Sequence, residues 1–149
     1  MSDEKSKVFE DEFMEVQSGL ISLCMEFLGE NEADKVYAYC SIEGKSCSFN
    51  AFFGTNNGIK MITDIESNMR RSVLFLRTGC HDLEKIKEVC ATYEKPVPTE
   101  IKMTYDVKSG KFDAKYCYDE ICSLETGKDQ SEVFMEWVAE IKQGYSNLT

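Results

Sequence analysis

The first part of the chain carries the pattern of an amphipathic helix. Between Lys7 and Leu28, apolar residues recur every three or four positions, and acidic residues and serines fill the places between them. This spacing puts the apolar side chains on one stripe of a helix. Gly29 then supplies a helix stop. We expect a helix over 7–28 whose inward stripe is Phe9, Phe13, Val16, Leu20, Cys24 and Phe27.

After this helix the apolar period shortens to two, which is typical of strands. Every second residue of Lys35–Glu43 is Val, Ala, Cys or Ile. The pair Gly44-Lys45 fits a two-residue hairpin turn that leads into a return strand, Ser46–Phe53. A second turn at Gly54–Gly58 precedes a short apolar segment, Ile59–Ile62. The pattern therefore predicts a three-stranded antiparallel meander.

The middle of the chain gives a less decisive pattern. Helical spacing over Leu83–Tyr93 predicts a helix that begins at Asp82 and ends before Pro96. Upstream, the block Val73–Leu76 fits either a buried helix or a strand, because so short a run does not distinguish the two periods. We favour a helix for this block, broken near Gly79.

A second hairpin and a last helix follow. Ile101–Val107 and Phe112–Tyr118 both alternate, and Lys108–Gly110 supplies the turn between them. A helix is expected over Gln130–Gly144, with Asp129 as its N-cap. Its expected inner face is Phe134, Trp137, Val138, Ile141 and Tyr145.

These elements predict one α+β domain over residues 1–149 in the order α-β-β-β-α-β-β-α, with flexible tails at 1–6 and 146–149. Strands that arrive as hairpins imply an antiparallel sheet of about five strands, with helices packed on one face. Alternation, however, points some strand aromatics away from that face. The sequence leaves two outcomes open: a partly exposed aromatic face or edge that binds a partner, or a sheet buried on both sides.

Composition places the chain among cytoplasmic globular proteins. It is 42% hydrophobic and 30% charged, and no apolar run approaches the roughly 20 residues of a membrane span. The acidic N-terminus lacks the basic-then-apolar order of a secretion signal. The seven cysteines are odd in number and form no C-x-x-C pair, so we expect small core hydrophobes in a reducing compartment. One reactive thiol stays open as an alternative.

The negative charge is concentrated at one end. The net charge is −10, and residues 1–34 hold ten acids against two lysines. An anionic protein repels phosphate backbones, so we expect no direct nucleic-acid binding. The acidic end, including Glu12 and Glu15, instead favours a basic protein partner.

The search for catalytic chemistry is negative. The single histidine, His81, has Cys80 and Asp82 as chain neighbours, but adjacent side chains on a helix diverge and do not face one another. One histidine and no paired cysteines give a zinc site no support. There is no glycine-rich phosphate-binding motif. We expect no enzyme activity, no metal and no cofactor.

The second hairpin contains the turn Ser109-Gly110-Lys111-Phe112 and the strand end Tyr116-Cys117-Tyr118-Asp119. In these motifs it resembles the YezG-type antitoxin or immunity family, formerly a domain of unknown function. Asp34–Glu43 is similar to the family's first strand, and the segment around Trp137 to its last helix. The chain departs from the family at Arg70–His81, where an apolar block and a glycine replace one long charged helix.

The resemblance implies a cytosolic antitoxin that neutralises the toxin domain, often a nuclease, of a secreted bacterial polymorphic toxin. An acidic secretion or effector chaperone of similar element order is the first alternative, and a small-molecule-binding module is the second. An antiparallel edge strand also leaves a homodimer open. The candidate partner-binding residues are Glu12, Glu15, Tyr37, Tyr39, Tyr116, Tyr118, Asp119 and Glu120.

Overall fold

Five antiparallel strands form the centre of the molecule in a computed structural model that describes residues 2–43, 46–122 and 126–147. Their order across the sheet is β3-β2-β1-β4-β5, so β1 lies in the middle and β3 and β5 lie at the edges. Both predicted hairpins and the meander are confirmed, with bounds within two residues of those expected. The strands are β1 (Lys35–Glu43), β2 (Ser46–Thr55), β3 (Gly58–Met61), β4 (Glu100–Asp106) and β5 (Phe112–Cys117).

The predicted α+β class, the element order and the five-stranded antiparallel sheet are confirmed. One short helix was not predicted: α2 follows β3 directly, and the Asp64 carboxylate accepts a hydrogen bond from the backbone N–H of Met61 at 2.8 Å. The predicted turn Gly44-Lys45 and the side chain of Tyr145 lie outside the described residues. The helices are α1 (Ser2–Leu28), α2 (Ile62–Ile65), α3 (Met69–Thr92) and α4 (Gln130–Asn147).

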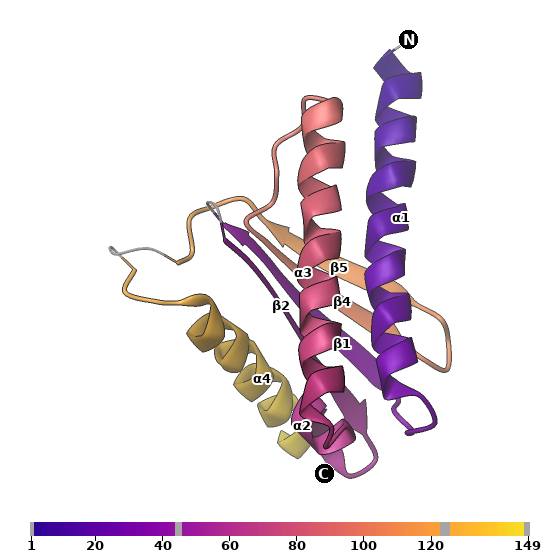
Figure 1. The fold of residues 1–149 in the computed structure, drawn as a ribbon, viewed down its shortest axis with the longest axis vertical. Helices are drawn as coiled ribbons and strands as arrows, with labels where there is room; N and C mark the ends of the chain where they lie inside the picture. The colour runs from indigo at the N-terminus through magenta and orange to yellow at the C-terminus, as the bar shows by residue number, and fades with distance from the viewer. Residues whose placement is uncertain (1, 44–45, 123–125, 148–149) are drawn as a thin grey trace.

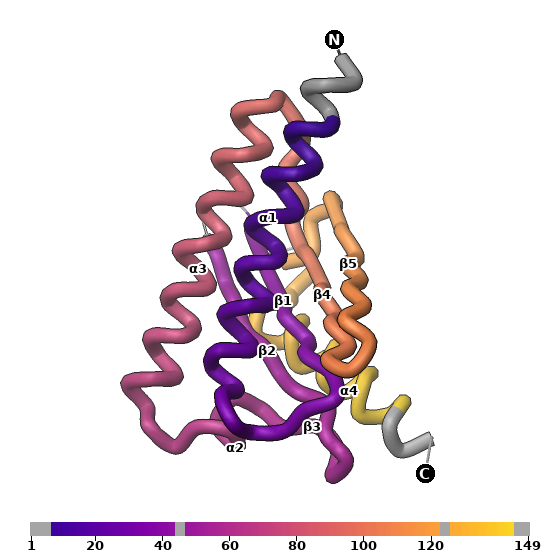
Figure 2. Tube along the Cα trace, turned by 90° about the vertical axis from the view of Figure 1, so that its right-hand side faces the viewer, coloured from indigo at the N-terminus to yellow at the C-terminus, as the bar shows by residue number. Residues whose placement is uncertain are grey.

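The helices cover both faces of the sheet, which corrects the prediction of helices on one face only. The antiparallel pair α1 and α3 covers one face, and α4 covers the other (Figures 1 and 2). The reason lies in β1, where every residue from Val36 to Ile42 is buried whichever way it points. A central strand that is apolar on both sides requires a covering layer on both sides.

The larger core lies between the sheet and the α1–α3 pair. The predicted stripe of α1 is confirmed, with Phe13, Leu20, Cys24 and Phe27 buried. The Phe27 ring stacks on Phe75 of α3 at a centroid distance of 4.3 Å. The sheet contributes Val36, Ala38, Cys40, Ile42, Phe49, Ala51, Phe53, Ile101 and Met103.

Helix α3 is continuous, so the predicted break near Gly79 and the predicted N-cap at Asp82 are both wrong. The helix begins after Asn68, whose side-chain oxygen accepts hydrogen bonds from two backbone N–H groups of the first turn. Gly79 is buried against the Phe49 ring, and a Cβ there would lie 2.7 Å from Phe49 Cε2 and nearer still to Cδ2. Glycine serves here to let helix and strand approach, not to end the helix.

The smaller core lies between the sheet and α4. Trp137 packs against Phe52 at a centroid distance of 5.0 Å and against Tyr37 at 5.8 Å. The predicted cap of α4 is confirmed, because the Asp129 carboxylate accepts a hydrogen bond from the backbone N–H of Glu132 at 2.8 Å. This core consists of Tyr37, Tyr39, Phe52, Val133, Phe134, Trp137 and Val138.

Candidate functional site

Two of the eight predicted partner-binding residues are buried in the structure and so are not accessible to a partner. Tyr37 and Tyr39 are buried under α4, and Tyr39 is only 1% exposed. They point to the face that the sequence was expected to leave open, and α4 closes that face. The other predicted residues are at the surface: Glu12, Glu15, Tyr116, Tyr118, Asp119 and Glu120.

The buried Tyr39 belongs to a polar pair inside the smaller core. Its hydroxyl donates a hydrogen bond to Glu100 Oε2 at 2.6 Å, and Lys102 Nζ lies 3.7 Å from Glu100 Oε1. Burial and the adjacent carboxylate of Glu100 together raise the pKa of Tyr39 well above its usual range. The pair therefore stays a neutral phenol donating to a carboxylate, which is a structural role.

Replacing Tyr39 with phenylalanine is expected to lower the free energy of unfolding by about 2 kcal/mol, because the buried carboxylate of Glu100 loses its short donor. Urea unfolding followed by circular dichroism measures the change. Tyr118→Phe is the matched control, since that side chain is 53% exposed and is expected to change stability by less than about 0.5 kcal/mol. Equal effects of both variants would contradict the structural role of the pair.

An aromatic row joins α3, α1 and β5 at one end of the molecule. Tyr93 lies 5.8 Å from Phe9, Phe9 stacks on Phe13 at 5.2 Å, and Phe13 lies 5.6 Å from Tyr116 (ring centroids). The row runs across the N-terminal half of α1, which lies beside the C-terminal half of α3 (Figure 1). Tyr93 was not among the partner-binding residues predicted from the sequence. Its helical spacing with Ile86 and Val89 indicated only that it lies at the end of the predicted helix.

Polar contacts hold the tyrosines of this row in place. The Tyr116 hydroxyl donates to Gln17 Oε1 at 2.8 Å, and Gln17 is fully buried. A hydrogen bond to the Glu12 carboxylate raises the pKa of Tyr93. Thr99 Oγ1 donates to the backbone oxygen of Asp119 at 2.6 Å, which fixes the chain just beyond β5. We call Glu12, Tyr93, Tyr116, Tyr118, Asp119 and Glu120 the acidic tyrosine surface.

A second surface, which the sequence reasoning missed, lies on the first turns of α3. Met69 is 74% exposed and Leu74 is 62% exposed, although both are large apolar residues. Of the block Val73–Leu76, only Phe75 is fully buried. The sequence already indicated this surface, because the three arginines of the chain lie in one eight-residue stretch, 70–77, that contains the apolar block. We call Met69, Arg70, Val73, Leu74 and Arg77 the arginine–apolar surface.

The arginine–apolar surface borders a shallow hollow of about 300 Å³ between α1 and α3, lined in part by Leu23, Phe27 and Leu74. The Arg71 guanidinium lies 5.7 Å from the Phe27 ring centroid, and its Nη1 is 2.9 Å from Glu66 Oε2. The hollow has the size and the lining for an apolar side chain of a binding partner.

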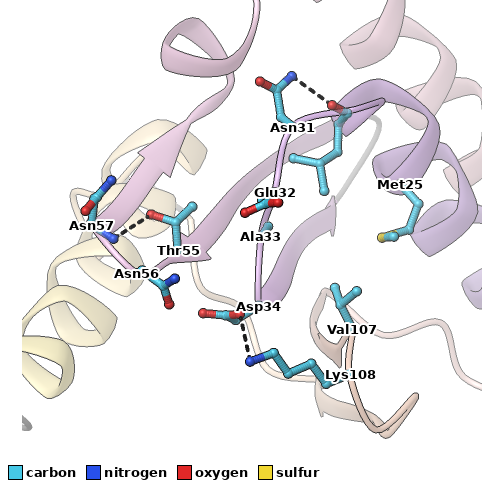
Figure 3. A pocket seen from close by; sticks show the side chains of 11 residues that line it. Met25, Asn31, Glu32, Ala33, Asp34, Thr55, Asn56, Asn57, Val107 and Lys108 are labelled. Carbon is cyan, nitrogen blue, oxygen red and sulfur yellow. Dashed lines mark hydrogen bonds and ion pairs between the residues drawn. The ribbon is translucent and has the colours of Figure 1, made fainter.

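A larger pocket of about 540 Å³ lies among the segments that follow α1, β2 and β4 (Figure 3). Asp34 Oδ1 is 3.7 Å from Lys108 Nζ, and Thr55 Oγ1 accepts a hydrogen bond from the backbone N–H of Asn57 at 3.1 Å. The pocket is open, and Asp34 and Thr55 are already engaged in these contacts. It does not have the enclosed apolar form expected of a small-molecule site.

The residues considered for catalysis do not assemble. His81 is exposed, and the Cys80 thiol donates to the backbone oxygen of Cys47 at 3.6 Å. Among the described residues, no three His, Cys, Asp or Glu side chains are grouped so as to hold a metal ion. The cysteines are free thiols, and burial raises the pKa values of Cys24 and Cys40. These two behave as core hydrophobes.

Within the part of the chain that the structure describes, no helix has the length and apolar character needed to cross a membrane. The exposed features described above are the acidic tyrosine surface and the arginine–apolar surface. No known protein family matches the chain and no curated protein matches it, so the resemblance to the YezG-type family rests on its motifs alone.

Proposed function

We propose that this protein is a cytoplasmic, non-enzymatic immunity protein or antitoxin. It binds the toxin domain of a secreted bacterial polymorphic toxin stoichiometrically and so neutralises it. The observation that carries the proposal is the acidic tyrosine surface, where three tyrosines, from the C-cap of α3, from β5 and from the segment after β5, lie among carboxylates. The occupant is a basic protein domain, such as a nuclease.

Physical chemistry favours this surface as a binding centre. Tyrosines bury a large area with few rotatable bonds, and Tyr116 is already held by Gln17 before any partner arrives. The surrounding acids attract a basic partner and raise its association rate. Residues 1–34 carry a net charge of −8, so the attraction extends along α1 beyond the contact itself.

The runner-up function is an acidic secretion or effector chaperone. The arginine–apolar surface favours it, because an extended effector segment docks with alternate apolar side chains on such exposed patches. That surface is basic whereas the acidic tyrosine surface is acidic, so the two proposals place their partners at different ends of α3.

The double variant Glu12→Lys/Tyr118→Ala is expected to weaken binding of a toxin domain encoded by an adjacent gene by about 100-fold, because it removes an acid and an aromatic anchor together. Isothermal titration calorimetry and growth rescue on co-expression measure the effect. The control Glu140→Lys/Met135→Ala makes the same kinds of change on the exposed face of α4 and is expected to alter affinity by less than about twofold.

Unrelieved growth arrest with no copurification of the two proteins would overturn the immunity proposal. If Leu74→Asp abolishes binding and Glu12→Lys/Tyr118→Ala retains full binding, the partner binds the arginine–apolar surface instead. That second result would favour the chaperone.

A further inference from the structure

The outer edge of β5 carries backbone groups that face away from the sheet. The N–H of Asp106 donates to the C=O of Lys111 at 2.9 Å, and the N–H of Thr99 donates to the C=O of Cys117 at 2.7 Å. Backbone groups alternate in direction along a strand, so the odd-numbered residues of β5 face β4. The N–H and C=O groups of Phe112, Ala114 and Tyr116 consequently face outward.

No described segment pairs with this edge. Strand β5 is the last strand of the sheet order, and among the described residues no backbone hydrogen bond uses these outward groups. Figure 2 shows β5 at the border of the sheet with no strand beyond it. An open edge of this kind is a template for another strand.

The sequence of β5 is self-complementary about Ala114. It reads Phe112-Asp113-Ala114-Lys115-Tyr116, so an aromatic residue and a charge stand on each side of the alanine, and the two charges are opposite. In an antiparallel pair of two such strands centred on Ala114, each Asp113 lies opposite Lys115 of the other copy. Each Phe112 likewise lies opposite Tyr116 of the other copy.

The same register also provides hydrogen-bond partners for the outward-facing backbone N–H and C=O groups of β5. Ala114 lies opposite Ala114, and Phe112 opposite Tyr116, so all the outward-facing groups meet as hydrogen-bonded pairs. Asp113 and Lys115 then form the intervening pairs without backbone hydrogen bonds, in which opposed side chains are closest. A register shifted by one residue would lose both the hydrogen bonds and the charge pairing.

The charges on β5 have no partner within the described chain. Lys115 lies opposite Lys102 of β4 in the sheet register, which sets two like charges side by side, and Asp113 lies opposite Thr104. Neither Asp113 nor Lys115 takes part in an ion pair among the described residues. A second copy places a carboxylate beside Lys115 and so relieves the repulsion between the lysines.

We propose that two copies of this chain pair through β5 into one continuous antiparallel sheet. The two-fold axis is perpendicular to the sheet and passes between the two paired Ala114 residues, so the contact is isologous and closed. Phe112 and Tyr116 of both copies lie on the face that carries α1, where Tyr116 is still 38% exposed in the single chain. Tyr116 also belongs to the acidic tyrosine surface, so the dimer contact borders the proposed toxin-binding surface, but its tests need no toxin.

The unmodified chain provides the first test. Sedimentation velocity from the micromolar to the millimolar range is expected to show a mass that rises to twice 17.0 kDa. Hydrogen–deuterium exchange read out by NMR is expected to show that the amides of Phe112, Ala114 and Tyr116 become protected over the same concentrations. A monomer at every concentration, or a dimer in which these amides stay unprotected, would overturn the proposal.

Charge exchange provides the second test. Lys115→Asp and Asp113→Lys each set like charges opposite one another twice in the dimer, and each is expected to weaken dimerisation by about tenfold or more. The double variant D113K/K115D restores opposite charges and is expected to return the dissociation constant to within about threefold of the original. Lys142→Asp on α4 is the control for a change of net charge, and circular dichroism checks the fold of each variant.

A dimer that is unaffected by both single variants would place the contact elsewhere and refute the pairing through β5. Failure of the double variant to recover dimerisation, with its fold intact, would refute the register.

Discussion

Replacing Trp137 with alanine is expected to lower the free energy of unfolding by about 3–5 kcal/mol, which is the cost of deleting a large buried aromatic side chain. Trp137 is the centre of the smaller core, where it contacts Phe52 and Tyr37, and Lys102 Nζ lies 5.8 Å from its ring centroid. Trp137 has the largest side chain among the residues that α4 contributes to the smaller core, so without it α4 is expected to detach before the rest of the protein unfolds. Urea unfolding by circular dichroism and amide exchange of α4 measure the two effects.

Two variants on the same helix separate packing from helix propensity. Trp137→Phe keeps an aromatic ring in the core and is expected to lose clearly less stability than Trp137→Ala. Met135→Ala changes an exposed residue of α4 and is expected to shift stability by less than about 0.5 kcal/mol. Amide protection in α4 that survives Trp137→Ala would show that the smaller core does not hold this helix.

Replacing Gly79 with alanine is expected to destabilise the protein by about 1–3 kcal/mol, although alanine is the better helix former. The added methyl group would overlap the Phe49 ring, which is buried and itself packs against Phe75 at a centroid distance of 5.4 Å. The ring, β2 or α3 has to move to admit the methyl group. The urea midpoint measures the loss.

The chain contains a matched control for this substitution. Gly19 also lies inside a long helix, but a Cβ there would meet nothing within 4 Å. Gly19→Ala is expected to stabilise the protein by about 0.5–1 kcal/mol through helix propensity alone. Phe49→Leu in the Gly79→Ala background is expected to recover part of the loss by making room. Stabilisation by both glycine substitutions would show that α3 does not approach β2 as closely as the structure has it.

The elements with a clear apolar period were predictable from the sequence. The bounds of β1 match the prediction, because alternation over nine residues between turn signals admits one interpretation. The α1 stripe and the Asp129 cap of α4 are equally local properties, and the structure contains both. The structure of residues 70–92 was harder to predict, because a glycine in a helical pattern indicates a break unless the element packed against it is known.

The candidate site likewise has residues whose exposure was predictable from the local sequence and residues whose exposure depends on the tertiary structure. Exposure of Glu12 follows from its place on the polar face of α1, and exposure of Tyr118 and Glu120 from their position just beyond the end of β5; the structure places all three at the surface. Whether Tyr37 and Tyr39 faced solvent depended on where α4 packs. Tyr93 joined the site only because α3 ends beside α1.

The sequence by itself determined the order of the elements, the pairing of the hairpins and the acidic character of α1, because each depends on residues close together in the chain. The tertiary structure alone decided that the sheet is covered on both faces, that Gly79 faces Phe49, and which tyrosines remain exposed. Those outcomes depend on contacts between distant segments. A periodic pattern specifies which side of a strand is apolar but not which helix will cover it.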